Sequence, residues 1–122
     1  MHKRIISHTD FDGLISAYLL REIFGVEEII FTEPWFIQQG ELEVRPGDII
    51  VDLPYDERCK LWIDHHKSNL ATAETLRKEQ PKKVVFDEKK KSCPSLIYEH
   101  FHKEHDFLED EDTKKMIAAA DK

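Results

Sequence analysis

Cysteine and long apolar runs are scarce in this chain. The 122 residues include two cysteines, Cys59 and Cys93, which are far apart and form no Cys-x-x-Cys pair, so we expect two reduced thiols. No apolar run approaches the ~20 residues of a membrane span. Residues 1–4 lead directly into a strand-like segment without a small-residue cleavage site. This start does not resemble a signal peptide, and we expect a cytoplasmic protein.

Glycine-rich phosphate loops and excess basic charge are also missing. No Gly-x-Gly-x-x-Gly motif follows the first strand-like segment, so the dinucleotide-binding fingerprint is absent, and so is a phosphate-cradling glycine loop. The net charge of −7 disfavours non-specific binding to long nucleic acid. Bound divalent cations would offset part of this charge and attract phosphate. The expected partners are therefore a small phosphorylated substrate or a short oligonucleotide.

The order of apolar segments predicts an α/β fold in one domain, residues 1–122. Strands are expected at 4–7, 28–32, 48–51, 60–63 and 84–86. Helices are expected at 14–24, 71–79, 92 to about 105, and 113–120, while 34–47 is expected to be irregular. Alternating strands and helices predict a three-layer fold, with a mainly parallel sheet of about five strands and helices on both faces.

The first predicted helix carries signals at both ends. Asp12 is the expected N-cap and Gly25 the expected stop. The helix is apolar nearly all round, which predicts that it is largely buried against the sheet.

Acidic residues and histidines gather where three predicted strands end. The first strand runs into His8, Asp10 and Asp12, the third runs into Asp52, and the fourth runs into Asp64-His65-His66. The carboxyl ends of parallel strands share one edge of a sheet, so these residues are expected to converge. Carboxylates at such density repel one another unless cations lie between them. The pattern therefore predicts a divalent metal site.

The three motifs together, in this order and spacing, resemble the DHH family of phosphoesterases. The resemblance covers essentially the whole chain, which is similar to the catalytic domain of that family and of its RecJ-like exonucleases and oligoribonucleases. It implies one metal on His8 and Asp10, a second on Asp12 and His65, and Asp52 as the bridge between them.

The resemblance also assigns roles to the remaining motif residues. Asp64 would not bind a metal itself but would orient the residues that do, and His66 would face the substrate phosphate. The segment Ala118-Ala119-Ala120-Asp121 resembles a fourth motif of the family, which makes Asp121 another candidate metal ligand.

Mixed carboxylate and imidazole ligands suit Mn²⁺ better than an all-oxygen Mg²⁺ site, so we expect two Mn²⁺ ions, with Mg²⁺ or another divalent ion as the alternative. Two such ions can activate a water and neutralise charge on the phosphorus oxygens. We therefore expect a phosphoesterase that hydrolyses phosphodiester or phosphomonoester bonds of a nucleotide-type or polyphosphate substrate. Asp52, Asp64 and His66 would act in catalysis.

Other polar residues have simpler interpretations. His100, His102 and His105 are expected on a solvated helix face, and Asp87 is expected in a charged turn. Ser92-Cys93 resembles a small-residue motif of the same family whose helix start lies near the metals, but Cys93 has no implied histidine partner that would make it a nucleophile.

A rival hypothesis is a phospho-accepting receiver domain, in which Asp10 and Asp12 hold Mg²⁺ and Asp52 accepts the phosphoryl group. It leaves His8 and the Asp64-His65-His66 triplet without a role. A non-catalytic metal-binding domain is a third alternative.

We also expect the chain to be incomplete as an enzyme. The family usually places a substrate-binding domain after the catalytic one, and no Gly-Gly-His-type motif is found here. The last predicted helix has no glycine cap and stops beside Asp121. Alternatively, a second copy of the chain in a homodimer, or the segment around Trp35, would supply the contacts to substrate that the absent domain would otherwise make.

Overall fold

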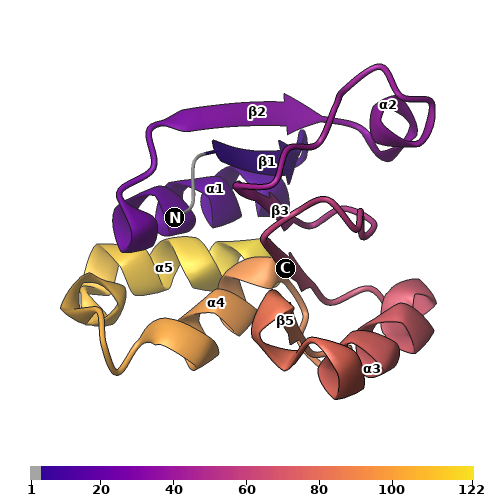
Figure 1. Ribbon diagram of the computed structural model, residues 1–122. Helices are drawn as coiled ribbons and strands as arrows, with labels where there is room; N and C mark the ends of the chain where they lie inside the picture. The colour runs from indigo at the N-terminus through magenta and orange to yellow at the C-terminus, as the bar shows by residue number, and fades with distance from the viewer. Residues whose placement is uncertain (1–3) are drawn as a thin grey trace.

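The computed structural model describes residues 4–122, so the expectation about the start of the chain lies largely outside the described residues. It contains five parallel strands, in the order β2-β1-β3-β4-β5 (Figure 1). The strands are β1 (Arg4–His8), β2 (Glu28–Thr32), β3 (Asp48–Val51), β4 (Leu61–Asp64) and β5 (Val84–Phe86). The predicted three-layer α/β fold is confirmed.

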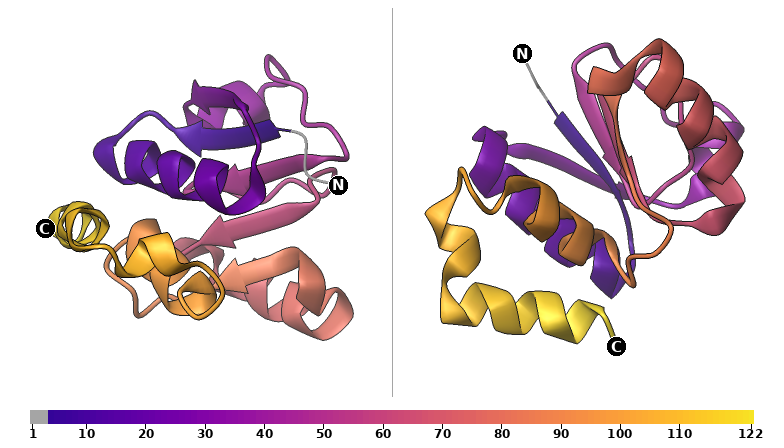
Figure 2. Two further views of the ribbon diagram at one scale, coloured as in Figure 1. Left: turned by 90° about the vertical axis from the view of Figure 1, so that its left-hand side faces the viewer. Right: turned by 90° about the horizontal axis from the view of Figure 1, so that it is seen from below.

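Helices cover both faces of the sheet (Figure 2). The α-helices are α1 (Phe11–Phe24), α2 (Pro34–Gln38), α3 (Leu70–Glu79), α4 (Cys93–Phe101) and α5 (Glu111–Ala120), and short 3-10 turns lie at Lys67–Asn69, Pro81–Lys83 and Asp106–Glu109. Helices α1, α4 and α5 pack together on one face, and α3 covers the other. Among residues 4–122, no helix is long and apolar enough to cross a bilayer.

Two hydrophobic cores follow from the alternation of side chains along the strands. Ile5, Ile49 and Ile63 point toward α1 and α4, whereas Ile50 and Trp62 point toward α3. Successive residues of a strand face opposite sides of the sheet, so a strand that is buried on both faces is apolar throughout. This explains why the strands are so easily recognised in the sequence.

Helix α1 begins earlier than the sequence predicted. Its N-cap is Asp10, not Asp12: Asp10 has extended backbone angles and its carboxylate accepts a hydrogen bond from the Gly13 amide at 2.8 Å. Asp12 lies inside the first turn, where its side chain is free to point at the strand ends. Gly25 ends the helix in the left-handed conformation, with φ of 66°, as predicted.

The helix is also less buried than its composition suggested. Leu14 and Tyr18 lie on its outer face and are 51% and 37% exposed, so the prediction of a largely buried helix holds only for the inner face.

Two other helix boundaries differ from the prediction. The segment 34–47 is not wholly irregular, because Pro34 occupies the first turn of the short helix α2. Helix α4 ends at Phe101 rather than near His105. The chain leaves the helix there and turns back, which allows Leu108 to be fully buried in the core.

A buried ion pair fixes the register of the two central strands. Arg4 of β1 lies opposite Asp48 of β3, and its guanidinium donates two hydrogen bonds, of 2.8 and 2.7 Å, to the Asp48 carboxylate. Both side chains are almost completely buried. Ser7 then pairs with Val51, so His8 and Asp52 leave the sheet side by side.

The start of α1 is pressed against the end of β1. A side chain on Gly13 would place its Cβ 2.0 Å from the His8 carbonyl oxygen, a distance that no real contact allows. The Ser7 hydroxyl donates a hydrogen bond of 2.7 Å to the Gly13 carbonyl across the same contact. Glycine at this position therefore brings the first turn of α1, with Asp12, to the carboxyl edge of the sheet.

Candidate metal centre

The acidic and histidine motifs converge at the carboxyl edge of β1, β3 and β4. Connections from β1 and β3 run in opposite directions across the sheet, because β2 lies on one side of β1 and β4 lies beyond β3. This reversal creates the crevice in which open parallel sheets bind ligands. Asp52 lies at its centre and belongs to three groups whose donor atoms are within 4.8 Å of one another.

The first group contains His8, Asp10 and Asp52. The Nδ1 atom of His8 lies 3.0 Å from an Asp10 oxygen and 3.6 Å from Asp52 Oδ2. The Nε2 atom of His8 makes a hydrogen bond of 2.7 Å to Glu33, which lies just after β2. Burial opposes protonation of His8, but the hydrogen bond to Glu33 and the nearby Asp10 raise the pKa of the imidazole overall.

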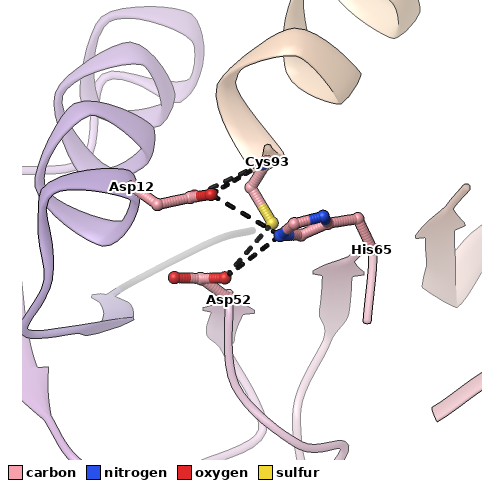
Figure 3. A group of neighbouring side chains, drawn as sticks. All are labelled: Asp12, Asp52, His65 and Cys93. Atoms are coloured by element: carbon pink, nitrogen blue, oxygen red, sulfur yellow. Dashed lines mark hydrogen bonds and ion pairs between the residues drawn. The ribbon is translucent and has the colours of Figure 1, made fainter. Parts of the chain in front are cut away.

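The second group contains Asp12, Asp52, His65 and Cys93, which come from α1, the end of β3, the end of β4 and the start of α4 (Figure 3). His65 Nε2 lies 3.5 Å from Asp12 Oδ2 and 3.6 Å from Asp52 Oδ1. Hydrogen bonding to Asp12 and then to Asp52 raises the pKa of His65 to about 10.

The side of the second group away from Asp52 is fixed by backbone atoms. The Cys93 amide donates to both Asp12 oxygens at 3.3 Å, so the N-terminus of α4 stabilises this carboxylate. His65 Nδ1 lies 3.0 Å from the Lys90 carbonyl oxygen, which fixes the imidazole ring from the opposite side.

The third group contains Asp52, Asp64 and His66. His66 Nδ1 lies 2.6 Å from Asp64 Oδ1, and its Nε2 lies 3.8 Å from Asp52 Oδ1. Asp64 is fully buried, and its other oxygen accepts a hydrogen bond of 2.7 Å from the Asn69 amide group. The hydrogen bond to Asp64 raises the pKa of His66, whose side chain is 48% exposed and can be reached from solvent.

The three histidines share one arrangement. In each, one ring nitrogen faces an acceptor that cannot donate: a Glu33 oxygen for His8, the Lys90 carbonyl for His65 and an Asp64 oxygen for His66. That nitrogen must carry the hydrogen, so in a neutral ring the other nitrogen presents its lone pair toward Asp52. Histidines that ligate metals are usually oriented by such an outer hydrogen bond.

Asp52 is the most unusual residue of the centre. It follows β3 with a φ of 61°, which makes it the one non-glycine residue with a positive φ among residues 4–122. Its side chain is 1% exposed, and Oδ2 has no hydrogen-bond partner within the described chain. Burial raises the pKa of its carboxyl group to about 6, although the hydrogen bond from His65 opposes the shift.

These features fit a bound cation. A buried carboxylate oxygen without a hydrogen bond costs free energy, and a strained backbone persists only where its surroundings hold it in place. A cation beside Asp52 would satisfy the oxygen and use the lone pairs of the imidazoles. The donor set consists of carboxylates and imidazoles, with the Cys93 thiol at one corner.

Asp121 does not join these groups, although the sequence suggested it as a ligand. Its carboxylate accepts hydrogen bonds from the hydroxyls of Ser92, at 2.5 Å, and Ser95, at 2.7 Å. It thus anchors the end of α5 to the start of α4, one residue away from Cys93. Asp121 is not among the donors of the three groups, and its role as a metal ligand stays a prediction.

Sequence reasoning missed three contributors to the centre: Glu33, Asn69 and the Lys90 carbonyl. Glu33 could have been found, because it directly follows a strand as the other acids do. It also accepts a hydrogen bond from the Thr9 hydroxyl, and the hydrogen bonds from Thr9 and His8 lower its pKa. The other two act through contacts that no local pattern reveals.

Comparison with known proteins adds one informative similarity. No family model matches the chain, and no curated protein matches it either. A solved structure, described as the pGpG-specific phosphodiesterase PggH from Vibrio cholerae, is similar with a TM-score of 0.76 and 27% sequence identity. The match covers 98% of this chain and 35% of that protein. The likeness supports a phosphodiesterase-like fold, while membership of the DHH family stays a prediction.

Proposed function

We propose that this chain is a metal-dependent phosphodiesterase domain that acts on a short nucleotide-type substrate. His8, Asp10 and Asp52 would hold one divalent cation, and Asp12, Asp52 and His65 would hold a second. Mn²⁺ is the proposed ion, because these mixed oxygen and nitrogen donors suit it better than Mg²⁺.

One observation carries the proposal: Asp52 lies at the intersection of all three donor groups, and three histidines are oriented to present a ring nitrogen toward it. A merely structural acidic cluster has no need for three separate outer hydrogen bonds that fix the imidazoles. It would also be expected to satisfy both oxygens of its most buried carboxylate, yet Asp52 Oδ2 has no such partner in the described chain.

The chemistry expected of bound divalent cations is the activation of water and the neutralisation of charge on a phosphoryl group. The side chains divide the remaining tasks. Asp52 is buried and belongs to both proposed metal positions, so its fixed backbone would hold the two positions side by side. Asp64 holds His66 through Nδ1 and raises the pKa of the ring, and when the ring is protonated Nε2 can donate a hydrogen bond to a phosphate oxygen or pass its proton to a leaving group.

A short linear dinucleotide is the proposed substrate. Support comes from the similar structure, which is described as specific for pGpG, and from the net charge of −7, which disfavours long nucleic acid. Phosphomonoesters and polyphosphate are weaker candidates on the same grounds. Because the match covers 35% of that protein, we also propose that residues outside this domain complete the binding of the substrate.

The receiver hypothesis is disfavoured by the burial of Asp52. The strand order 2-1-3-4-5 is shared with doubly wound folds of the receiver type, so the fold alone does not separate the two functions. A phosphoacceptor must be reached by a phosphodonor, but the Asp52 side chain is 1% exposed and His65 and His66 crowd its Oδ1 atom.

The proposal is tested by incubating the purified chain with pGpG and with an activated phosphodiester, each with Mn²⁺ and with a chelator. We expect metal-dependent hydrolysis, loss of more than ~100-fold in rate for Asp52→Asn, and no change for the control Asp106→Asn on the exposed surface. Hydrolysis that persists in Asp52→Asn, or stable phosphorylation of Asp52 by a small phosphodonor, would contradict the proposal.

A further inference from the structure

Cys93 is the one member of the centre for which the proposed phosphodiesterase chemistry gives no role. Its thiol is fully buried at the first residue of α4, with Sγ 3.9 Å from Asp52 Oδ1 and 3.9 Å from the Ile63 carbonyl oxygen. A buried cysteine usually behaves as a small apolar side chain. This one instead lies among the carboxylates and the imidazole of the second group (Figure 3).

Three of the separations between donor atoms are close to those of a four-coordinate site. With metal bonds of ~2.0 Å to nitrogen or oxygen and ~2.3 Å to sulphur, the edges of a tetrahedron are about 3.3 to 3.5 Å long. The observed distances are 3.5 Å from His65 to Asp12, 3.6 Å from His65 to Asp52, and 3.9 Å from Cys93 to Asp52. These three separations are within about half an ångström of tetrahedral edges, and all four donor atoms lie within 4.8 Å of one another.

A second, independent observation points to a ligand at this place. The Asp52 side chain is 1% exposed and its Oδ1 faces the second group, whereas Oδ2, which has no hydrogen-bond partner in the described chain, lies 3.6 Å from His8 Nδ1 on the side of the first group. Its Oδ1 is shared by Cys93, His65 and His66, none of which lies closer than 3.6 Å. In the described chain the nitrogens nearest Oδ1 lie beyond normal hydrogen-bond length, and the Cys93 thiol offers Oδ1 only a weak hydrogen bond, so this buried carboxylate lacks the strong partners that a cation would supply.

We propose that Cys93 is a thiolate ligand of the second metal position, together with Asp12, Asp52 and His65, and that this position selects a thiophilic divalent cation such as Zn²⁺ or Co²⁺. The inference rests on the proposed function, because it assumes a cation at the centre. On binding, the S–H bond breaks, the proton leaves to solvent and the sulphur–metal bond forms. The two positions then differ in preference: soft sulphur favours Zn²⁺ or Co²⁺, whereas His8, Asp10 and Asp52 form a harder position suited to Mn²⁺.

The test uses cobalt, because a thiolate bound to Co²⁺ gives an intense charge-transfer band in the near ultraviolet. The chain offers a matched control, since its other cysteine, Cys59, is buried in the core on the α3 side of the sheet. We expect the band in the unmodified chain and in Cys59→Ser, and its loss in Cys93→Ser. Affinity for Zn²⁺ should fall at least ~10-fold in Cys93→Ser, with little change for Mn²⁺.

X-ray absorption of the Cys59→Ser protein loaded with one equivalent of Zn²⁺ keeps the inference testable if Cys93→Ser does not fold. We expect one sulphur neighbour at ~2.3 Å. Bound zinc or cobalt with only nitrogen and oxygen neighbours, or a cobalt band that survives in Cys93→Ser, would overturn the thiolate assignment and leave the proposed function intact. Failure to bind Mn²⁺, Co²⁺ or Zn²⁺ at all would refute both.

Discussion

Metal binding by this protein should release protons, and the number released should depend on pH. The cause is His65, whose pKa is raised to about 10 by Asp12 and Asp52. An imidazole must be neutral to ligate a metal, so the cation has to displace the proton that the carboxylates hold on the ring. In the metal-free protein, protonated His65 supplies the positive charge that the acidic cluster needs.

The size of the effect follows from the pKa values. At pH 7, which is three units below 10, about one His65 ring in 1,000 is neutral, so loss of this proton alone should raise the apparent metal affinity of the second position ~10-fold for each unit of pH up to about 9. Asp52, with a pKa of about 6, contributes a second proton only below pH 6. For an ion bound at the second position, the protons released by His65 and Asp52 should therefore number close to one at pH 7 to 8 and should increase toward two at pH 5. A Zn²⁺ ion that is also held by the Cys93 thiolate should release one more.

Isothermal titration calorimetry with Mn²⁺ and Zn²⁺, in pairs of buffers with different ionisation enthalpies, measures this number directly. His65→Gln should lower proton release at pH 7.5 by about one per ion, whereas His100→Gln, an exposed residue outside the centre, should leave it unchanged. If affinity were independent of pH between 6 and 8.5, or if His65→Gln released as many protons as the unmodified chain, metal binding would not be linked to deprotonation of His65.

Three further perturbations test other parts of the structure. Gly13→Ala forces a Cβ against the His8 carbonyl, so it should lower the free energy of unfolding by ~1–3 kcal/mol or more in chemical denaturation, and unchanged stability would contradict the close approach. Glu33→Ala removes the partner of His8 Nε2 and should weaken Mn²⁺ binding ~10–100-fold, with partial rescue in Glu33→Gln; equal affinity in all three proteins would exclude a positioning role. Burial raises the pKa of Asp52, so its ionisation should destabilise the metal-free protein by up to about 3 kcal/mol as pH rises from 4 through 6. Asp52→Asn should lack this loss of stability. Parallel curves of stability against pH for the two proteins would show that the carboxyl group titrates normally.

The sheet and most of the centre could be predicted because their signals are local. Each strand is a short apolar run, and His8, Asp52 and Asp64 come directly after such runs, so the rule that parallel strands end at one edge was enough to bring them together. The choice of Asp10 over Asp12 as N-cap could not be predicted in this way, since both residues are aspartates, which cap helices equally well, and the backbone angles decide between them.

Contacts between distant parts of the chain account for the features of the centre that the sequence did not predict. Cys93 and Asp12 are 81 positions apart, and only the packing of α4 beside α1 brings the Cys93 amide to the Asp12 carboxylate. The place of Asp121 depends in the same way on how α5 turns back onto α4, where Ser95 offers a hydroxyl. No periodicity or spacing in the sequence reports such packing.

The ion pair between Arg4 and Asp48 has a consequence for how this protein can be altered. The alignment of His8 with Asp52 is set by this pair at the opposite end of β1 and β3, and not by the length of the chain that joins the strands. A slip of one residue would turn every side chain of a strand to the other face and would break the buried pair at the same time. The exposed stretch at 39–41, which lies before the Glu43 carbonyl that accepts a hydrogen bond from Arg4, is therefore the place where the connection can vary in length or accept an inserted peptide while the metal centre keeps its geometry.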